Sequence, residues 1–383
     1  MRIVEPVKVQ HPSKSSTAQL LREEWFLGVS VATVGIFLLV GDRLDAGLSN
    51  PLGLALLFGC LFGVVLGSCL CVVRHADQIA ETVGEPYGTL VLTLSVTTIE
   101  VLSISAVMLH GDNEPTLVRD TLFSVVMIIL GGMAGISLLL GGWRYREQQF
   151  NLQGANAYLG LIVPMTVFSL TLPNFTVTSA GPTLSVAQQI FLTLMSVGLY
   201  GTFLAVQTGR HRSYFTMGET GSADTPREQA SARPSLLLHA VLLLAYILPV
   251  AFLAEELARP IDFLIETMHV PAAIGGIVIA MIVATPEAVG ATRAALQNKL
   301  QHAVNIFLGS VLSTIGLTVP IMLIISRITG RVVHLGLTGA NDVLLLLTLA
   351  VSVVTFTSGR TNVLQGAVHL VLFAAFVLFI FEG

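Results

Sequence analysis

Two glutamates stand alone inside long apolar stretches of the sequence, one in each half of the chain. Glu100 lies in TLVLTLSVTTIEVLSISAVML and Glu287 lies in IGGIVIAMIVATPEAVGATRAAL. A glycine precedes each glutamate by twelve positions, Gly88 directly before the first stretch and Gly275 within the second. An ionisable group at the centre of a bilayer costs about 2.5–3.5 kcal/mol on insertion scales, so a matched pair indicates a function.

The chemistry open to this pair is the binding of a hard cation in competition with protons. Carboxylate and hydroxyl oxygens suit ions such as Ca²⁺ and Na⁺, and two carboxylates neutralise one divalent ion. A carboxylate that loses its cation in an apolar interior takes up a proton rather than remain charged. Competition for the same oxygens is what cation/proton antiport requires. A permanently protonated glutamate that bridges two helices is the structural alternative, and it explains one such residue better than a matched pair.

Groups near the two glutamates are candidates for the rest of a ligand set. Thr97, Thr98 and Thr285 lie one helical turn or less from a glutamate. Pro286 has no backbone N–H, so it can leave a carbonyl free in the preceding turn. On the following spans Ser310 is the best candidate, although ordinary helix packing is an alternative for every hydroxyl. The other candidates on those spans are Thr121, Ser124, Asn305, Ser313 and Thr314.

Composition places these residues in a membrane protein. Of 383 residues, 54% are hydrophobic and 11% are charged, whereas a soluble domain carries about 25% charged residues. The first 24 residues are polar and the first apolar run opens at Trp25, so we expect a cytoplasmic tail over 1–24 and no cleaved signal peptide. The net charge of -4 argues against a nucleic-acid partner.

Apolar runs of about 20 residues, separated by turn residues, predict an all-α polytopic membrane protein with about eleven transmembrane helices. The expected spans are 25–41, 51–73, 86–110, 119–142, 156–172, 184–207, 235–254, 271–296, 303–326, 341–357 and 361–381.

The longest polar stretch, 209–234, is predicted to be a flexible cytoplasmic linker that divides the chain. We expect a peripheral first helix and loop over 25–50, a first repeat over 51–208 and a second repeat over 235–383. With five spans each, the two repeats enter the membrane from opposite sides, which is the inverted-repeat architecture of many secondary transporters. In that arrangement the two glutamates can meet near the midplane.

The positions of Lys and Arg predict the orientation in the membrane. With a cytoplasmic N-terminus, fourteen of the nineteen basic residues fall on the cytoplasmic side. We therefore expect the N-terminus inside and the C-terminus outside. The five basic residues on the outer side are Arg43, Arg119, Arg259, Arg327 and Arg331.

Three further features have a structural and a functional interpretation. Glu85 opens the third span, where an acid suits the helix dipole or the approach of cations. His369 lies inside the last span, either as a packing group or as a pH sensor. Four acidic residues are expected in an outer loop over 255–270, as a solvated surface or as a means of concentrating cations. They are Glu255, Glu256, Asp262 and Glu266.

Long motifs around these residues resemble the calcium/cation antiporter superfamily, most closely its bacterial calcium/proton antiporter branch (the ChaA type). The runs that carry the resemblance are GEPYGTLVLTLSVTTIEV (84–101), ATPEAVGATRAALQNKLQHAVNIFLGSVLSTIGLTVP (284–320) and SGRTNVLQGAVHLVLF (358–373). The resemblance implies a ten-helix exchanger core with one additional N-terminal helix. It also implies that Glu100 and Glu287 bind both the cation and the protons. The first run lacks the Asn and the Pro that the wider superfamily usually carries before this glutamate.

Sequence and resemblance together predict a secondary transporter of the bacterial inner membrane. It would exchange Ca²⁺, and also Na⁺ and K⁺, for protons by alternating access. The alternatives are a monovalent Na⁺(K⁺)/H⁺ antiporter with little Ca²⁺ activity, or a cation channel. A membrane enzyme would need His ligands or a Ser/His arrangement at membrane depth, so none is expected. No cofactor is expected either, and the expected partners are the transported cations, protons and the lipid bilayer.

Overall fold

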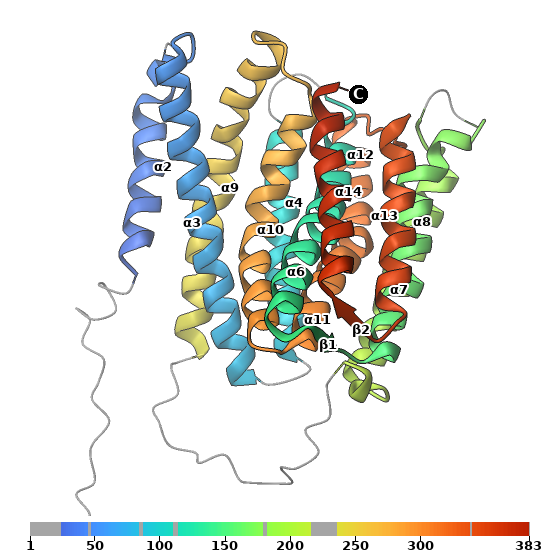
Figure 1. Ribbon diagram of the computed structural model, residues 1–383. Helices are drawn as coiled ribbons and strands as arrows, with labels where there is room; N and C mark the ends of the chain where they lie inside the picture. The colour runs from blue at the N-terminus through green and yellow to red at the C-terminus, as the bar shows by residue number, and fades with distance from the viewer. Residues whose placement is uncertain are drawn as a thin grey trace, which may run out of the picture.

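The computed structural model describes residues 24–44, 47–83, 87–109, 114–178, 182–215, 236–337 and 339–382. In this part the chain forms a bundle of helices that lie side by side, with two short strands at one end (Figure 1). The strands β1 (Glu147–Gln149) and β2 (Arg360–Asn362) pair antiparallel. Most of the expected linker 209–234, the tail before Glu24 and the position of Glu85 lie outside the described residues.

The helices fall into two sets along the chain. The first set is α2 (Trp25–Leu44), α3 (Pro51–Val83), α4 (Tyr87–Leu109), α5 (Leu117–Val126), α6 (Ala134–Tyr145), α7 (Leu152–Thr166) and α8 (Val186–Thr208). The second set is α9 (Leu236–Glu266), α10 (Ala273–Leu296), α11 (Leu300–Ser313), α12 (Val319–Thr329), α13 (Ala340–Phe356) and α14 (Val363–Glu382).

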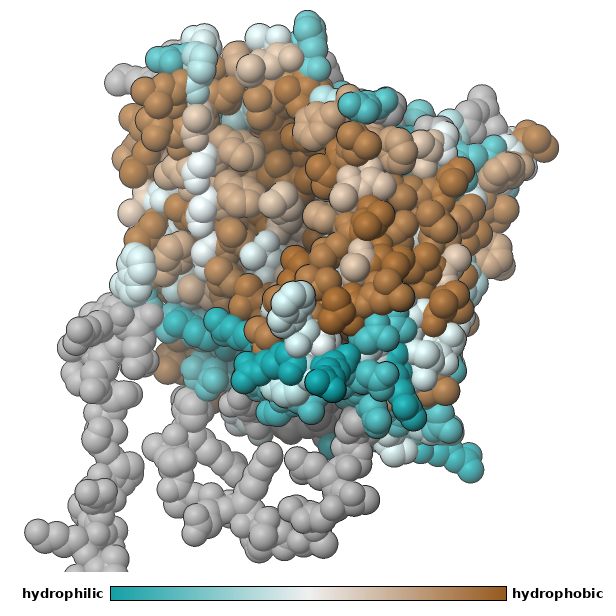
Figure 2. All heavy atoms as spheres, in the orientation of Figure 1, coloured by the Kyte–Doolittle hydropathy of each residue, from teal (hydrophilic) through white to brown (hydrophobic). Residues whose placement is uncertain are grey.

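The fold is that of an all-α polytopic membrane protein. Among the described residues, nine helical segments are long and apolar enough to cross a membrane. Their outer side chains form a broad hydrophobic surface with a hydrophilic rim along its lower edge (Figure 2). A helix lies in each of the eleven expected ranges, but the apolar part of α2 (Trp25–Gly41) and all of α13 are shorter than the other nine. The number of eleven crossings therefore stays a prediction.

Two long helical segments form the centre of the bundle. Leu117–Tyr145 and Leu300–Thr329 are more deeply buried than the other long apolar segments of the described chain. Each contains a π-helical stretch, η2 (Met127–Met133) in the first and η6 (Thr314–Thr318) in the second. Such stretches occur frequently at functional sites, because the wider turn redirects side chains and backbone groups.

The helices α4 and α10 pack beside these central segments and against each other. They run in opposite directions, because α3 joins α4 at the lower end of the bundle and α9 joins α10 at the upper end (Figure 1). Gly276 lets α10 approach α5 closely, since a Cβ there would lie 2.6 Å from the backbone nitrogen of Thr121. Small residues have this role at many helix contacts in membranes.

Local signals set several helix ends. Ser185 caps α8 through a reciprocal pair of hydrogen bonds with Gln188, which satisfies backbone N–H groups that the first turn leaves free. Asn151 caps α7 in the same position. Gly330 follows α12 with a φ of 73°, the left-handed conformation that glycine adopts at little cost.

The acidic residues expected in an outer loop over 255–270 belong to a helix, so that prediction is wrong. The helix α9 continues to Glu266 and includes Pro260. Glu256 is buried and pairs with Arg259, with 3.2 Å between Arg259 Nε and Glu256 Oε2. Because this pair is spaced i,i+3, it supports the helix beyond its apolar part.

Candidate cation site

Glu100 is held in the interior of the bundle by two threonines from the other half of the chain. It lies on α4 and is 1% exposed. Its Oε2 atom accepts hydrogen bonds from Thr314 Oγ1 at 3.0 Å and from Thr318 Oγ1 at 2.9 Å. Both threonines belong to the π-helical stretch η6. The stretch therefore positions the Glu100 carboxylate.

Glu287 reaches the same central segment from α10. Its Oε2 atom accepts a hydrogen bond from Ser310 Oγ on α11. Ser310 precedes Thr314 by four residues, so the two hydroxyls lie one turn apart on one helix face, about 6 Å along the axis. The carboxylates of Glu100 and Glu287 thus approach one face of the segment Leu300–Thr329.

Three buried oxygens at this point have no hydrogen-bond partner within the described residues. They are Thr97 Oγ1, Glu100 Oε1 and Ser103 Oγ, on neighbouring turns of α4. A buried polar oxygen without a partner is costly, and hard cations bind carboxylate and hydroxyl oxygens. The donor set therefore fits a cation or a proton that is taken up and released.

The site differs in chemistry from a tight transition-metal centre. No group of three or more His, Cys, Asp or Glu side chains suited to a metal ion occurs in the described part of the chain. Hydroxyl and carboxylate oxygens bind Ca²⁺, Na⁺ and K⁺ rather than Zn²⁺ or Cu²⁺. Weak oxygen ligands also allow the release that transport requires.

The structure brings only some of the expected ligands to the two carboxylates. Ser310 contacts Glu287 directly, and Thr97 is buried one turn before Glu100. The hydroxyls of Thr98 and Thr285 instead donate to carbonyls of their own helices, those of Leu94 and Met281.

Pro286 is buried inside α10, which continues through it without a break. Because Pro has no N–H, the carbonyl of Ile282 receives no helical hydrogen bond from position 286.

The amide of Asn305 bonds to groups other than the two glutamates, whereas the sequence predicted it as a supporting cation ligand. Its Nδ2 donates to the carbonyl of Phe215 at 2.7 Å, and its Oδ1 accepts from Gln301 at 2.9 Å. It ties α11 to the segment that follows α8. The hydroxyls of Thr121 and Ser124 also donate to backbone carbonyls one turn earlier.

His369 has partners for both ring nitrogens. Nδ1 lies 2.6 Å from the carbonyl oxygen of Leu130, in η2, and Nε2 lies 3.1 Å from Thr355 Oγ1. The side chain is fully buried. These contacts favour a packing role at the π-helical stretch over a pH sensor.

Sequence reasoning missed Thr318 and Ser103. The spacing of Ser310, Thr314 and Thr318 was the available signal, because residues four apart share a helix face. Ser103 lies three residues after Glu100, on the neighbouring turn.

Thr318→Val should weaken the apparent cation affinity about tenfold, because it removes a hydrogen bond to a charged group, worth about 1.5–3 kcal/mol. Valine keeps the shape of threonine, so the fold should persist. Cation-dependent exchange by the reconstituted protein measures the effect. Thr329→Val, on the same helical segment, is the matched control because the exposed Thr329 hydroxyl bonds only to nearby backbone groups, the carbonyl of Ile325 and the N–H of Arg331. Equal affinities for the two variants would remove Thr318 from the site.

The chain is similar to known proteins over most of its length. The family model for the sodium/calcium exchanger protein matches residues 53–209 and 238–382. The chain is similar to the sodium-potassium/proton antiporter ChaA of Escherichia coli strain K12, with 39% identity over 333 residues, which is 86% of this chain and 90% of the relative. It is also similar to the Ca²⁺/H⁺ antiporter ChaA of Bacillus subtilis strain 168, with 24% identity over 67% of this chain and 73% of the relative.

A solved structure shares the fold. The structure of native YfkE covers 94% of this chain and 100% of its own length, with a TM-score of 0.72 at 20% sequence identity. The likeness extends over both halves of the bundle.

Proposed function

Since this chain belongs to the sodium/calcium exchanger family and is a cation/proton antiporter, we propose that it exchanges Ca²⁺, Na⁺ and K⁺ for protons at Glu100 and Glu287. One observation carries the proposal. Two carboxylates from opposite halves of the chain approach one face of a buried helix, and Glu100 Oε1 has no partner within the described residues. This arrangement suits an ion that binds both halves at once.

The mechanism follows from the cost of buried charge. One divalent cation, or two monovalent charges supplied by Na⁺, K⁺ or protons, neutralises the two carboxylates, and the loaded site can then face either side of the membrane in turn. The empty pair leaves two negative charges in an apolar interior, which is strongly unfavourable. The empty transporter therefore does not reorient, so the movement of cations stays coupled to that of protons.

The residues 51–208 and 235–383 form inverted repeats in this proposal. Three observations support it. The glutamate-bearing helices α4 and α10 run in opposite directions (Figure 1). The buried segment that follows each of them contains a π-helical stretch. The family model matches both parts of the chain.

A monovalent Na⁺(K⁺)/H⁺ antiporter with little Ca²⁺ activity is the second candidate. The 39%-identical relative supports it, because its name specifies sodium, potassium and protons. Uptake by proteoliposomes separates the two candidates when Ca²⁺, Na⁺ and K⁺ are offered separately against an imposed pH gradient. Proton-coupled Ca²⁺ uptake supports the wider specificity, and its absence beside Na⁺ or K⁺ uptake would leave the monovalent exchanger. Uptake of every cation without any proton movement would exclude exchange and leave a channel.

We propose that the chain lies in the bacterial inner membrane with the N-terminal end of α2 on the cytoplasmic side. The described chain begins at the lower end of α2, and α14 ends at the upper end of the bundle (Figure 1). A cysteine introduced at Ser213 should be protected from an impermeant reagent in intact cells, and one at Glu382 should react. A Cys60→Ala background is needed because Cys60 is exposed. The reverse labelling pattern would overturn this orientation.

A further inference from the structure

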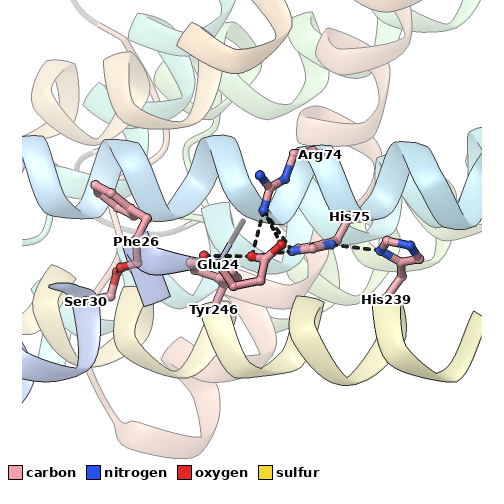
Figure 3. Close-up of polar contacts among 7 residues, drawn as sticks. All are labelled: Glu24, Phe26, Ser30, Arg74, His75, His239 and Tyr246. Carbon is pink, nitrogen blue, oxygen red and sulfur yellow. Dashed lines mark hydrogen bonds and ion pairs between the residues drawn. The ribbon is translucent and has the colours of Figure 1, made fainter. Parts of the chain in front are cut away.

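A second group of ionisable side chains joins the start of α2 to α3 and α9, outside the cation site (Figure 3). Glu24, directly before α2, is its centre. Its carboxylate accepts from Arg74 Nη2 at 2.7 and 2.8 Å and from Tyr246 Oη at 3.0 Å, and it lies 3.3 Å from His75 Nε2. The Glu24 side chain is only 13% exposed. One carboxylate thus ties the start of α2 to both neighbouring helices.

A histidine pair extends this group from α3 to α9. His75 Nδ1 lies 3.0 Å from His239 Nδ1, and the two ring centroids are 5.3 Å apart. His75 is 1% exposed and its ring stacks on Tyr246. His239 Nε2 is buried and has no hydrogen-bond partner within the described residues. Figure 3 shows Glu24, His75 and His239 in a line, with the His75 ring between the Glu24 carboxylate and the His239 ring.

The Nδ1 contact requires one proton between the two rings, because one nitrogen must donate and the other must accept. His75 Nε2 lies 3.3 Å from Glu24 Oε2 and 3.4 Å from Arg74 Nη2. In the neutral pair we assign the Nε2 proton to the bond with Glu24, so that His75 accepts at Nδ1 from His239. His239 Nε2 is then the free basic nitrogen. One added proton there makes an imidazolium that donates to a neutral imidazole, and such a charge-assisted hydrogen bond is stronger than the neutral one.

The surroundings can accommodate one added proton and no more. The titratable and charged groups around His75 are Glu24 before α2, Cys71 and Arg74 on α3, and His239 and Tyr246 on α9. Glu24 balances the charge of Arg74, and the His75 ring separates Glu24 from the protonated His239. With a second proton both Nδ1 atoms would carry an N–H group, so the two N–H groups would point at each other and two positively charged rings would be in contact.

We propose that His75 and His239 form a second proton-binding site, and that its protonation tightens the link between the two halves and slows exchange. The helices α3 and α9 open the two halves, and both pack against α4 and α10, which carry the glutamates. The proposal rests on the proposed function, because the rate that protonation lowers is that of cation/proton exchange at the glutamates. Acid would then lower the maximal rate through the histidine pair, independently of cation affinity at the glutamates.

The test measures exchange by reconstituted protein at equal pH on both sides, driven by a cation gradient. For the wild type, the maximal rate should fall as the pH is lowered from 7.5 to 5.5, because the pair then binds a proton and exchange slows. His239→Gln and His75→Gln keep hydrogen-bonding groups but cannot titrate, so their maximal rates should change less than about twofold over the same range. His302→Gln, at an exposed histidine outside the group, is the matched control and should follow the wild type.

A second readout does not depend on transport. Trp25 adjoins Glu24, and a Trp143→Phe variant leaves it as the single tryptophan of the chain. Its fluorescence should change with pH near the His range, and His239→Gln should remove that change.

The proposal is overturned if His239→Gln retains the wild-type fall in maximal rate, or if Trp25 fluorescence responds equally in both backgrounds. Failure of the proposed function gives a different result, in which the apparent cation affinity does not depend on pH in any variant.

Discussion

Replacing either membrane glutamate with glutamine should abolish cation/proton exchange and leave a folded protein. Glutamine in Glu100→Gln or Glu287→Gln keeps the size of the side chain and can still accept a hydrogen bond from Thr318 or Ser310. It can neither bind and release a proton nor supply one of the two negative charges that neutralise a divalent cation. Breaking a buried charge pair costs about 3–5 kcal/mol, so the initial rate should fall more than about a hundredfold.

Glu147→Gln is the matched control for this pair of substitutions, because Glu147 is a glutamate of the strand β1 with a largely exposed side chain. Its exchange rate should equal that of the wild type. Size-exclusion profiles of the purified variants show whether the bundle is intact. Wild-type rates in Glu100→Gln or Glu287→Gln, at normal expression, would contradict the mechanism.

The apparent cation affinity should weaken as the pH falls, because protons and cations bind the same carboxylates. The empty carboxylates bind more protons than the cation-loaded ones, so lowering the pH favours the cation-free state. One competing proton weakens the affinity by up to about tenfold per pH unit, and two competing protons weaken it further. The range between about pH 7 and pH 9 is the informative one, because it lies above the ordinary titration of histidine near 6.5.

Initial rates at a series of cation concentrations, measured at each pH, give this affinity apart from the maximal rate. The His239→Gln variant should show the same dependence of affinity on pH, since the histidine pair acts on the maximal rate. An affinity that stays constant over this range would mean that protons and cations use different oxygens.

The positions of the helices could be predicted from apolar run length, but two helix ends could not. The sequence predicted spans that end near 73 and 254, whereas α3 continues to Val83 and α9 to Glu266. Hydropathy reports the part of a helix that lies in lipid. Beyond that part, polar contacts such as the Glu256–Arg259 pair hold the helix together, and they leave no apolar signal.

The two glutamates, Ser310 and Thr314 could be selected as site candidates from position and residue type, whereas Thr318 was missed and the pairing of both threonines with Glu100 could not be predicted. Thr314 and Thr318 are 214 and 218 residues away from Glu100 in the sequence, so only the fold brings them to it. Nearness along the chain was a poor guide. Thr98 is two residues from Glu100, and at about 100° per residue it lies on the other side of α4. No pattern in the sequence distinguished Glu24, which contacts His75 of the histidine pair.

The most direct test of a shared site counts the protons released when a cation binds to the purified protein in weakly buffered solution near neutral pH. Ligands that must be deprotonated release protons when a cation binds. The wild type should release protons on binding Ca²⁺, Na⁺ or K⁺, up to about two for each divalent ion, and Glu100→Gln and Glu287→Gln should each reduce or abolish this release. Cation binding to the wild type without any proton release would contradict the account.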